Sequence, residues 1–149
     1  MPDNWRHTKS WHNVPLDVFY GTLKRAVDNG FTVAIGGDVS ESGYDGTMDA
    51  AFVPPFDIPE ACINQDAREF RFANRTSTDD HLVHVVGHTM LDDHDWYLIK
   101  DSARSARKGR FEGYLFYRED YIKLKTLVFL VHRDAVDPAV LERFQSPVQ

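Results

Sequence analysis

A succession of short strand-like runs fills the second half of the chain and constrains the fold more than any other feature. The runs are rich in β-branched and aromatic residues and read HLVHVV, WYLIK, GYLFY and TLVFLVH. The acidic turn LDDHD separates the first two, a charged loop separates the next two, and the short helical stretch REDYIKL precedes the last. Runs of this length, divided by turn residues, are typical of paired strands. The pattern therefore predicts a small antiparallel sheet.

A helix is predicted before this sheet, in NVPLDVFYGTLKRAVDNG. Asn13 is placed to cap it, Pro15 fits its first turn and Gly30 fits the position just after its end. Apolar residues recur at helical spacing, so one stripe should be buried and the opposite face should meet water. The buried stripe is Leu16, Phe19, Tyr20, Leu23 and Val27, and the solvent face is Asp17, Lys24, Arg25 and Asp28.

Two further elements complete an α+β arrangement. FTVAI, ended by Gly36 and Gly37, predicts a strand directly after the helix. DPAVLERF predicts a short C-terminal helix, because Asp137 stands at a cap position and Pro138 in the first turn. The sequence thus predicts an antiparallel sheet with a packed N-terminal helix and a short C-terminal helix.

Length and charge define the broad class of protein. With 149 residues, of which 42% are hydrophobic, residues 1–149 are expected to form a single domain. The net charge is −6 with both signs interspersed, which argues against nucleic acid and against a membrane surface as partners. No apolar run could span a bilayer, and MPDNWRHTKSWHN lacks the apolar core of a signal peptide. A cytoplasmic location is therefore expected.

The connection from Met48 to about Thr78 has no regular period. It contains Pro54, Pro55 and Pro59, and a short helix is indicated from IPEACINQDAREF onward. So long a connection inside a compact domain usually carries function or covers a partner surface. It also contains Cys62, the single cysteine, which excludes an internal disulfide and a multi-cysteine zinc site.

The residues with the clearest chemical potential are His81 and Asp101. His81 opens the first strand of the sheet, and Asp101 ends the second. Because antiparallel strands return to the same end of a sheet, the two side chains are expected to lie close together. In cysteine-peptidase chemistry a histidine takes the proton of a thiol, while a third group holds the imidazole by accepting from its other nitrogen. His81 and Asp101 are therefore the candidate catalytic residues.

On these residues the chain resembles the bleomycin hydrolase and aminopeptidase C branch of the papain-like cysteine peptidases. The family's catalytic histidine opens a strand and is followed by glycine after five residues, as in DHLVHVVG, and YLIKDSARS stands where the family has a YxxKNSWG-like segment. GYLFYREDYIKLKTLVFLVHRDAV looks like the family's closing segment, and NVPLDVFYGTLKRAVDNGFTVAIGGDVSE like its helix and following strand. The resemblance covers nearly the whole chain and implies the C-terminal lobe of a peptidase.

Three departures from the family pattern bear on activity. Asp101 replaces the asparagine, Ala103 the tryptophan and Arg104 the glycine behind it. Aspartate can still accept from the imidazole, so this change need not abolish catalysis. The tryptophan normally shields the histidine–asparagine bond, so alanine is expected to leave that bond wet and weaker.

The family's nucleophilic cysteine and oxyanion-hole glutamine have no counterpart in this chain. The setting of Cys62, PEACINQDAR, does not match, and Cys62 is interpreted as an ordinary thiol. The isolated chain is therefore expected to be inactive. Its partners would be a peptide substrate or a separate N-terminal peptidase lobe. The alternative is a non-catalytic pseudo-peptidase that acts as an interaction module, whose exposed apolar face would favour self-association or a homo-oligomer.

Two other functional interpretations are weaker. A metal site is suggested by a dense set of ligand-type residues, but alternation puts His81 and His84 on opposite faces of a strand, and LDDHD reads as a solvated turn. The full set is His81, His84, His88, Asp92, Asp93 and His94. The basic run RSARSARKGR could bind an anion, but a solvated loop is the favoured interpretation. No metal and no cofactor are therefore predicted.

Overall fold

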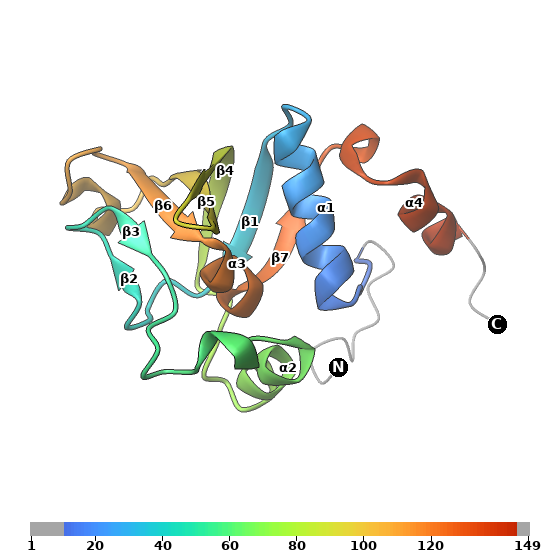
Figure 1. Ribbon diagram of the computed structural model, residues 1–149. Coiled ribbons are helices and arrows are strands. Elements are labelled where there is room, and N and C mark those ends of the chain that lie inside the picture. Colours follow the sequence, from blue (N-terminus) through green and yellow to red (C-terminus); the bar gives the residue numbers. More distant parts are fainter. Residues whose placement is uncertain (1–10, 146–149) are drawn as a thin grey trace.

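The computed structural model describes residues 11–145 and combines helices with one curled sheet (Figure 1). The strands are β1 (Val33–Gly37), β2 (Tyr44–Asp45), β3 (Ala50–Ala51), β4 (His81–Leu91), β5 (His94–Lys100), β6 (Tyr114–Arg118) and β7 (Thr126–Leu130). The helices are α1 (Leu16–Asp28), α2 (Gln65–Ala73), α3 (Glu119–Lys125) and α4 (Pro138–Gln145), with 3₁₀ turns at Glu60–Cys62, Ser105–Arg107 and Arg133–Ala135. The predicted α+β architecture with a helix near each end is confirmed. The first ten residues, on which most of the signal-peptide interpretation rests, lie outside the described residues.

The strand order across the sheet is β2-β3-β6-β5-β4-β1-β7. Five of the six neighbouring pairs are antiparallel, but β3 and β6 run parallel, so the sheet is mixed rather than purely antiparallel as predicted. The difference arises in the irregular connection after β1. Strands of two residues, such as β2 and β3, show no alternation that a sequence pattern could reveal.

Helix α1 ends as predicted but begins later. Gly30 has a φ of 81°, and the amides of Gly30 and Phe31 donate to the carbonyls of Val27 and Ala26, which is a Schellman ending. The predicted cap at Asn13 is wrong, because the helix starts after Pro15. The amide of Leu16 instead donates to Oε1 of Gln65 at 2.6 Å, so α2 supplies the cap from a distance in sequence.

The core lies between the helices and the inner face of the sheet. Helix α1 contributes Leu23 and Ala26, and Phe19 is also buried. Alternate residues of the strands and one side of α3 provide most of the remainder: Val33, Ile35, Val83, Val85, Tyr97, Ile99, Leu115, Tyr117, Tyr121, Ile122 and Leu124. Figure 1 shows α1 and α3 beside the sheet, with α4 on the far side of α1. This rigid framework fixes the strand ends at which the candidate site lies.

Candidate active site

His81 is the first residue of β4 and belongs to the inner face of the sheet. It pairs with Gly37 of β1, as the next inward residue, Val83, pairs with Ile35. Gly37 is required here, because a Cβ at this position would collide with the carbonyl of Lys125. The His81 side chain is 25% exposed, so its ring sits at the border between core and solvent.

Asp101 follows β5 directly and meets His81 across the end of the β4–β5 pair. Nε2 of His81 lies 2.7 Å from Oδ1 of Asp101, which also accepts from the amide of Ala103 at 2.7 Å. In the tautomer in which Nε2 donates to Asp101, Nδ1 is the nitrogen free to take up a proton. The expected proximity of the two side chains is therefore present in the structure.

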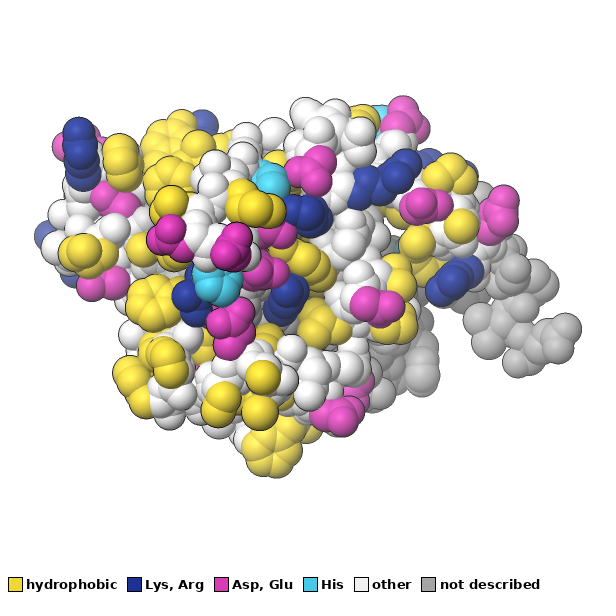
Figure 2. Space-filling view, in the orientation of Figure 1, with side chains coloured by type: hydrophobic (Ala, Val, Ile, Leu, Met, Phe, Trp, Pro, Cys, Tyr) yellow, Lys and Arg dark blue, Asp and Glu magenta, His cyan; other side chains and the backbone are white. Residues whose placement is uncertain are grey.

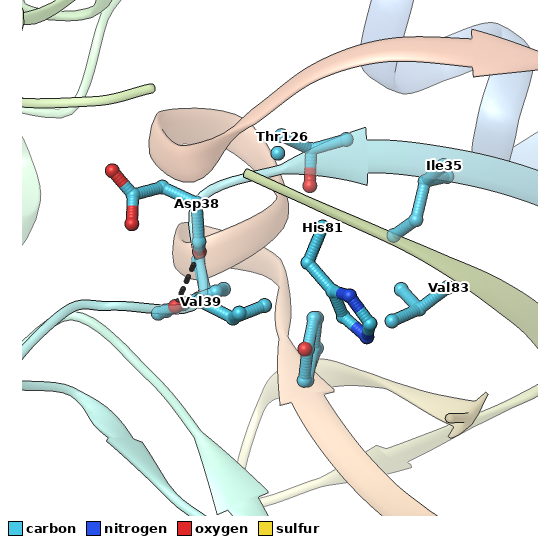
Figure 3. A pocket seen from close by; sticks show the side chains of 9 residues that line it. Ile35, Asp38, Val39, His81, Val83 and Thr126 are labelled. Atoms are coloured by element: carbon cyan, nitrogen blue, oxygen red, sulfur yellow. Dashed lines mark hydrogen bonds between the residues drawn. The ribbon is translucent and has the colours of Figure 1, made fainter. Parts of the chain in front are cut away.

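A small pocket of about 10 Å³ lies beside the His81 ring, which is space for a single water molecule (Figure 3). Its lining includes Ile35, Asp38, Val39, Val83 and Thr126, with Tyr117 and Tyr121. The Tyr121 hydroxyl donates to the Asp38 carbonyl at 2.7 Å. The Tyr117 hydroxyl is buried without a hydrogen-bond partner, and so is Oδ2 of Asp101. Sequence analysis did not single out these tyrosines, although the alternation of GYLFY places Tyr117 on the inner face.

The Asp101 carboxylate is dry, contrary to the expectation drawn from Ala103. Its side chain is 0% exposed although no tryptophan stands at position 103. The sequence shows which residues lie beside Asp101 in the chain, but not which groups the fold brings near its carboxylate. The His81–Asp101 hydrogen bond thus lies in a low-dielectric environment, where it is electrostatically stronger than in water.

Cys62 makes no contact with the hydrogen-bonded pair of His81 and Asp101 among the described hydrogen bonds. It is exposed, in the 3₁₀ turn before α2, and none of the hydrogen bonds among residues 11–145 joins it to His81. The candidate site therefore consists of a histidine and its acceptor, without a thiol within hydrogen-bonding reach in the described part of the chain.

The histidine-rich region does not converge on a metal. No group of three ligand-type side chains able to hold a metal ion occurs among the described residues. His81 faces inward and His84 is exposed, as alternation predicted. A bulge between Val85 and Gly87 then turns His88 inward, opposite Tyr97. Asp92 and Asp93, exposed and with φ of 51° and 61°, form the tight turn predicted for LDDHD.

His88 instead joins a buried polar cluster between α1 and the β4–β5 hairpin. Oδ1 of Asp95 lies 2.7 Å from both Nζ of Lys24 and Nε2 of His88, and the Tyr20 hydroxyl donates to its Oδ2 at 2.7 Å. Burial alone would raise the pKa of Asp95, but these hydrogen bonds outweigh it and lower the pKa to about 2. Lys24, predicted to face water, thus points into the hairpin because Asp95 is there to pair with it.

The basic run is a solvated loop. Arg104, Arg107, Lys108 and Arg110 are exposed, and Ala106 between them is buried and anchors the loop. Asp49 anchors the loop, because its Oδ2 accepts from the amides of Arg110 and Phe111 at 2.6 and 3.2 Å. The arginines therefore do not gather around a buried centre.

Comparisons with known proteins establish the fold and nothing finer. No family model matches the chain, and no curated protein sequence matches it. A solved structure, that of PepW from Lactobacillus rhamnosis HN001, matches with a TM-score of 0.65 over 89% of this chain at 16% sequence identity. The chain covers 29% of the PepW chain. The chain is therefore an α+β domain of papain-like fold that is similar to one lobe of a peptidase. Within residues 11–145, no helix is long and apolar enough to cross a membrane.

Proposed function

We propose that this chain is the C-terminal lobe of a papain-like cysteine peptidase of the aminopeptidase and bleomycin hydrolase type. In this proposal His81 is the base, Asp101 holds it, and a separate N-terminal lobe supplies the nucleophilic thiol. The observation that carries the proposal is the 2.7 Å hydrogen bond between a half-buried imidazole and a fully buried carboxylate at one end of the sheet. The fold similarity to a peptidase lobe supports the same conclusion.

The proposed chemistry follows from the free nitrogen of His81. Nδ1 takes the proton of the partner's thiol, and the thiolate sulfur attacks the carbonyl carbon of a peptide bond. The imidazolium then returns the proton to the leaving amine, which departs and leaves a thioester. His81 next takes a proton from water, whose oxygen displaces the sulfur and releases the acid. Asp101 accepts from Nε2 throughout and stabilises the imidazolium that forms.

The isolated chain is expected to lack activity, because the thiol must come from elsewhere. The first assay uses fluorogenic aminoacyl substrates under reducing conditions with the purified chain, His81→Ala and Cys62→Ser. We expect no turnover from any of the three proteins. Turnover that is lost in both variants would make Cys62 the nucleophile and would overturn the assignment of a thiol-free lobe.

A second assay tests the role of His81 directly. The tagged chain is purified from its native host together with the polypeptide that supplies the thiol, and the assembly is assayed with the same substrates. Loss of a general base typically lowers kcat by about 10²–10⁴, and we expect such a loss for His81→Ala. His84→Ala is the matched control, since His84 lies on the same strand and faces outward. Equal activity in both variants would contradict the proposal.

A non-catalytic interaction module is the second candidate function. It is favoured by an open apolar groove on the outer face of the sheet, lined by Leu98, Phe111, Tyr114 and Phe116. Figure 2 shows hydrophobic side chains gathered over the region of β5 and β6 and around α2. Exposed apolar surface of this kind marks protein contact sites. Normal complex formation by His81→Ala, with no measurable hydrolysis by the wild-type assembly, would favour this candidate.

A further inference from the structure

The dryness of Asp101 requires a cover that sequence neighbours do not provide. Ala103 is too small to shield the carboxylate, yet the Asp101 side chain is 0% exposed. The loop after β5 folds back here, since the amide of Asp101 donates to the Gly113 carbonyl at 2.8 Å, and elements packed on this loop can add to the cover of the hydrogen bond between His81 and Asp101. The short β2–β3 hairpin is the element that meets the loop after β5.

The hairpin is fixed to this loop at several points. Gly46, just after β2, packs so closely on the loop that an added Cβ would collide with the carbonyl of Ser105. Asp49, just before β3, accepts from the amides of Arg110 and Phe111, and an added Cβ on Gly109 would collide with its carboxylate. The hairpin and the loop thus form one packed unit, and close backbone contact fixes the position of β2 beside this loop.

Tyr44, the first residue of β2, contacts both the loop that follows Asp101 and Tyr117 on the inner face of the sheet. Its hydroxyl lies 3.2 Å from Oγ of Ser105, and its ring packs edge-on against Tyr117, with 6.3 Å between centroids. Tyr117 in turn lines the pocket beside His81. Burial is the largest cause that raises the pKa of Tyr44, hydrogen bonding with Ser105 opposes it, and both the charge of Asp101 and hydrogen bonding with Asp101 raise it further. Tyr44 is therefore partly desolvated and close to the carboxylate.

We propose that Tyr44 is a positioning residue that covers the hydrogen bond between His81 and Asp101 and replaces the aromatic shield that position 103 lacks. The inference rests on the proposed function for its catalytic meaning, but its geometry concerns only this chain. Because the cover comes from a different strand, the loss of tryptophan at position 103 does not by itself disable the pair. We assign the exclusion of water to the ring, which packs against Tyr117, and Tyr44→Phe tests this assignment against a contribution of the hydroxyl.

Exchange of the His81 Nε2 proton with water tests this inference without any peptidase assay. The proton is followed by NMR in ¹⁵N-histidine-labelled chain and assigned by its absence from His81→Ala. Removing the cover lets water reach the bond, so we expect Tyr44→Ala to speed exchange by at least about tenfold. Tyr44→Phe keeps the ring and is expected to exchange like the wild type. Backbone amides of Val85 and Ile99, deep in the core, report whether the fold is intact.

Further substitutions at positions 44 and 103 distinguish loss of the cover from loss of the fold. If Tyr44→Ala does not fold, Tyr44→Leu takes its place, because leucine retains some apolar packing but lacks the aromatic ring that packs against Tyr117. Adding Ala103→Trp to either variant is expected to restore slow exchange. Unchanged exchange in a folded Tyr44→Ala or Tyr44→Leu protein would overturn the inference, as would equal acceleration in Tyr44→Phe. Neither result would contradict the proposed function, which is tested separately by the activity of the His81→Ala assembly.

Discussion

Arg68 connects three parts of the fold through one buried side chain. Its guanidinium, carried by α2, donates to the carbonyls of Lys123, Thr126 and Leu127. These carbonyls lie at the end of α3 and the start of β7, where the helix leaves backbone acceptors without partners. The guanidinium also lies 4.6 Å from the Phe19 ring of α1. Burial lowers the pKa of Arg68 to about 10, because a buried cation loses its hydration.

Replacing this cation should therefore destabilise the whole domain. In Arg68→Met the apolar stem remains over Phe19, but the three carbonyls lose their donor. A lost hydrogen bond from a charged group typically costs about 1.5–3 kcal/mol, and we expect the free energy of unfolding to fall by at least that amount. Urea unfolding followed by circular dichroism measures it. The exposed Arg75 provides the control, and an Arg75→Met effect of the same size would contradict the role given to Arg68.

At the scale of elements, the polar cluster around Asp95 fastens α1 to the β4–β5 hairpin. Asp95 accepts from Lys24 and Tyr20 of α1. His88 of β4 lies between Asp95 and Asp28 of α1, with its Nδ1 3.0 Å from Oδ1 of Asp28. The Tyr97 hydroxyl of β5 donates to that of Tyr20 at 3.0 Å and extends the network. A buried network with its members paired restrains the relative position of the elements that supply them. The helix and the hairpin should thus unfold together.

The low pKa of Asp95 predicts how acid affects this connection. A carboxylate whose pKa is lower in the folded chain stabilises the fold fully above its unfolded pKa of about 3.9, and this contribution is lost as the pH falls toward 2. We expect Asp95→Asn to lower stability at pH 7 by about 1–2 kcal/mol and to flatten its dependence on pH between 4 and 2. Thermal unfolding across this range measures both effects. Asp17→Asn, on the exposed face of α1, should leave the wild-type pH profile intact.

An element could be predicted from the sequence where its structure depends on residues close together in the chain. Gly30 ends α1 as predicted because the requirement for a left-handed φ belongs to that residue itself. The pairing of His81 with Asp101 was predictable because antiparallel strands bring their ends together. The donors of Arg68 meet backbone carbonyls, which every residue carries, so no pattern marks its position. Likewise Tyr44 lies on a two-residue strand, too short to show an alternating pattern, whose antiparallel pairing with β3 is set by tertiary packing.

At the scale of the whole molecule, the sheet has one covered face and one that carries exposed apolar side chains. Tyr97, Ile99, Leu115 and Tyr117 point into the core, so the alternate residues Leu98, Tyr114 and Phe116 point outward. Phe111 extends this outer surface and is 47% exposed. Binding of a partner lobe or of a second copy of the chain would remove this surface from water. In a solution of the isolated chain, only a second copy is available.

The isolated chain should therefore self-associate through this face, despite its net charge of −6. We expect sedimentation velocity to give a mass above the 17.1 kDa of the monomer, rising with protein concentration. A Phe111→Glu, Tyr114→Lys double variant places charge in the groove and should return the mass to that of the monomer. Phe70→Glu alters an exposed aromatic on α2, away from the groove, and should leave association unchanged. A wild-type chain that remains monomeric at every concentration would contradict self-association through this face.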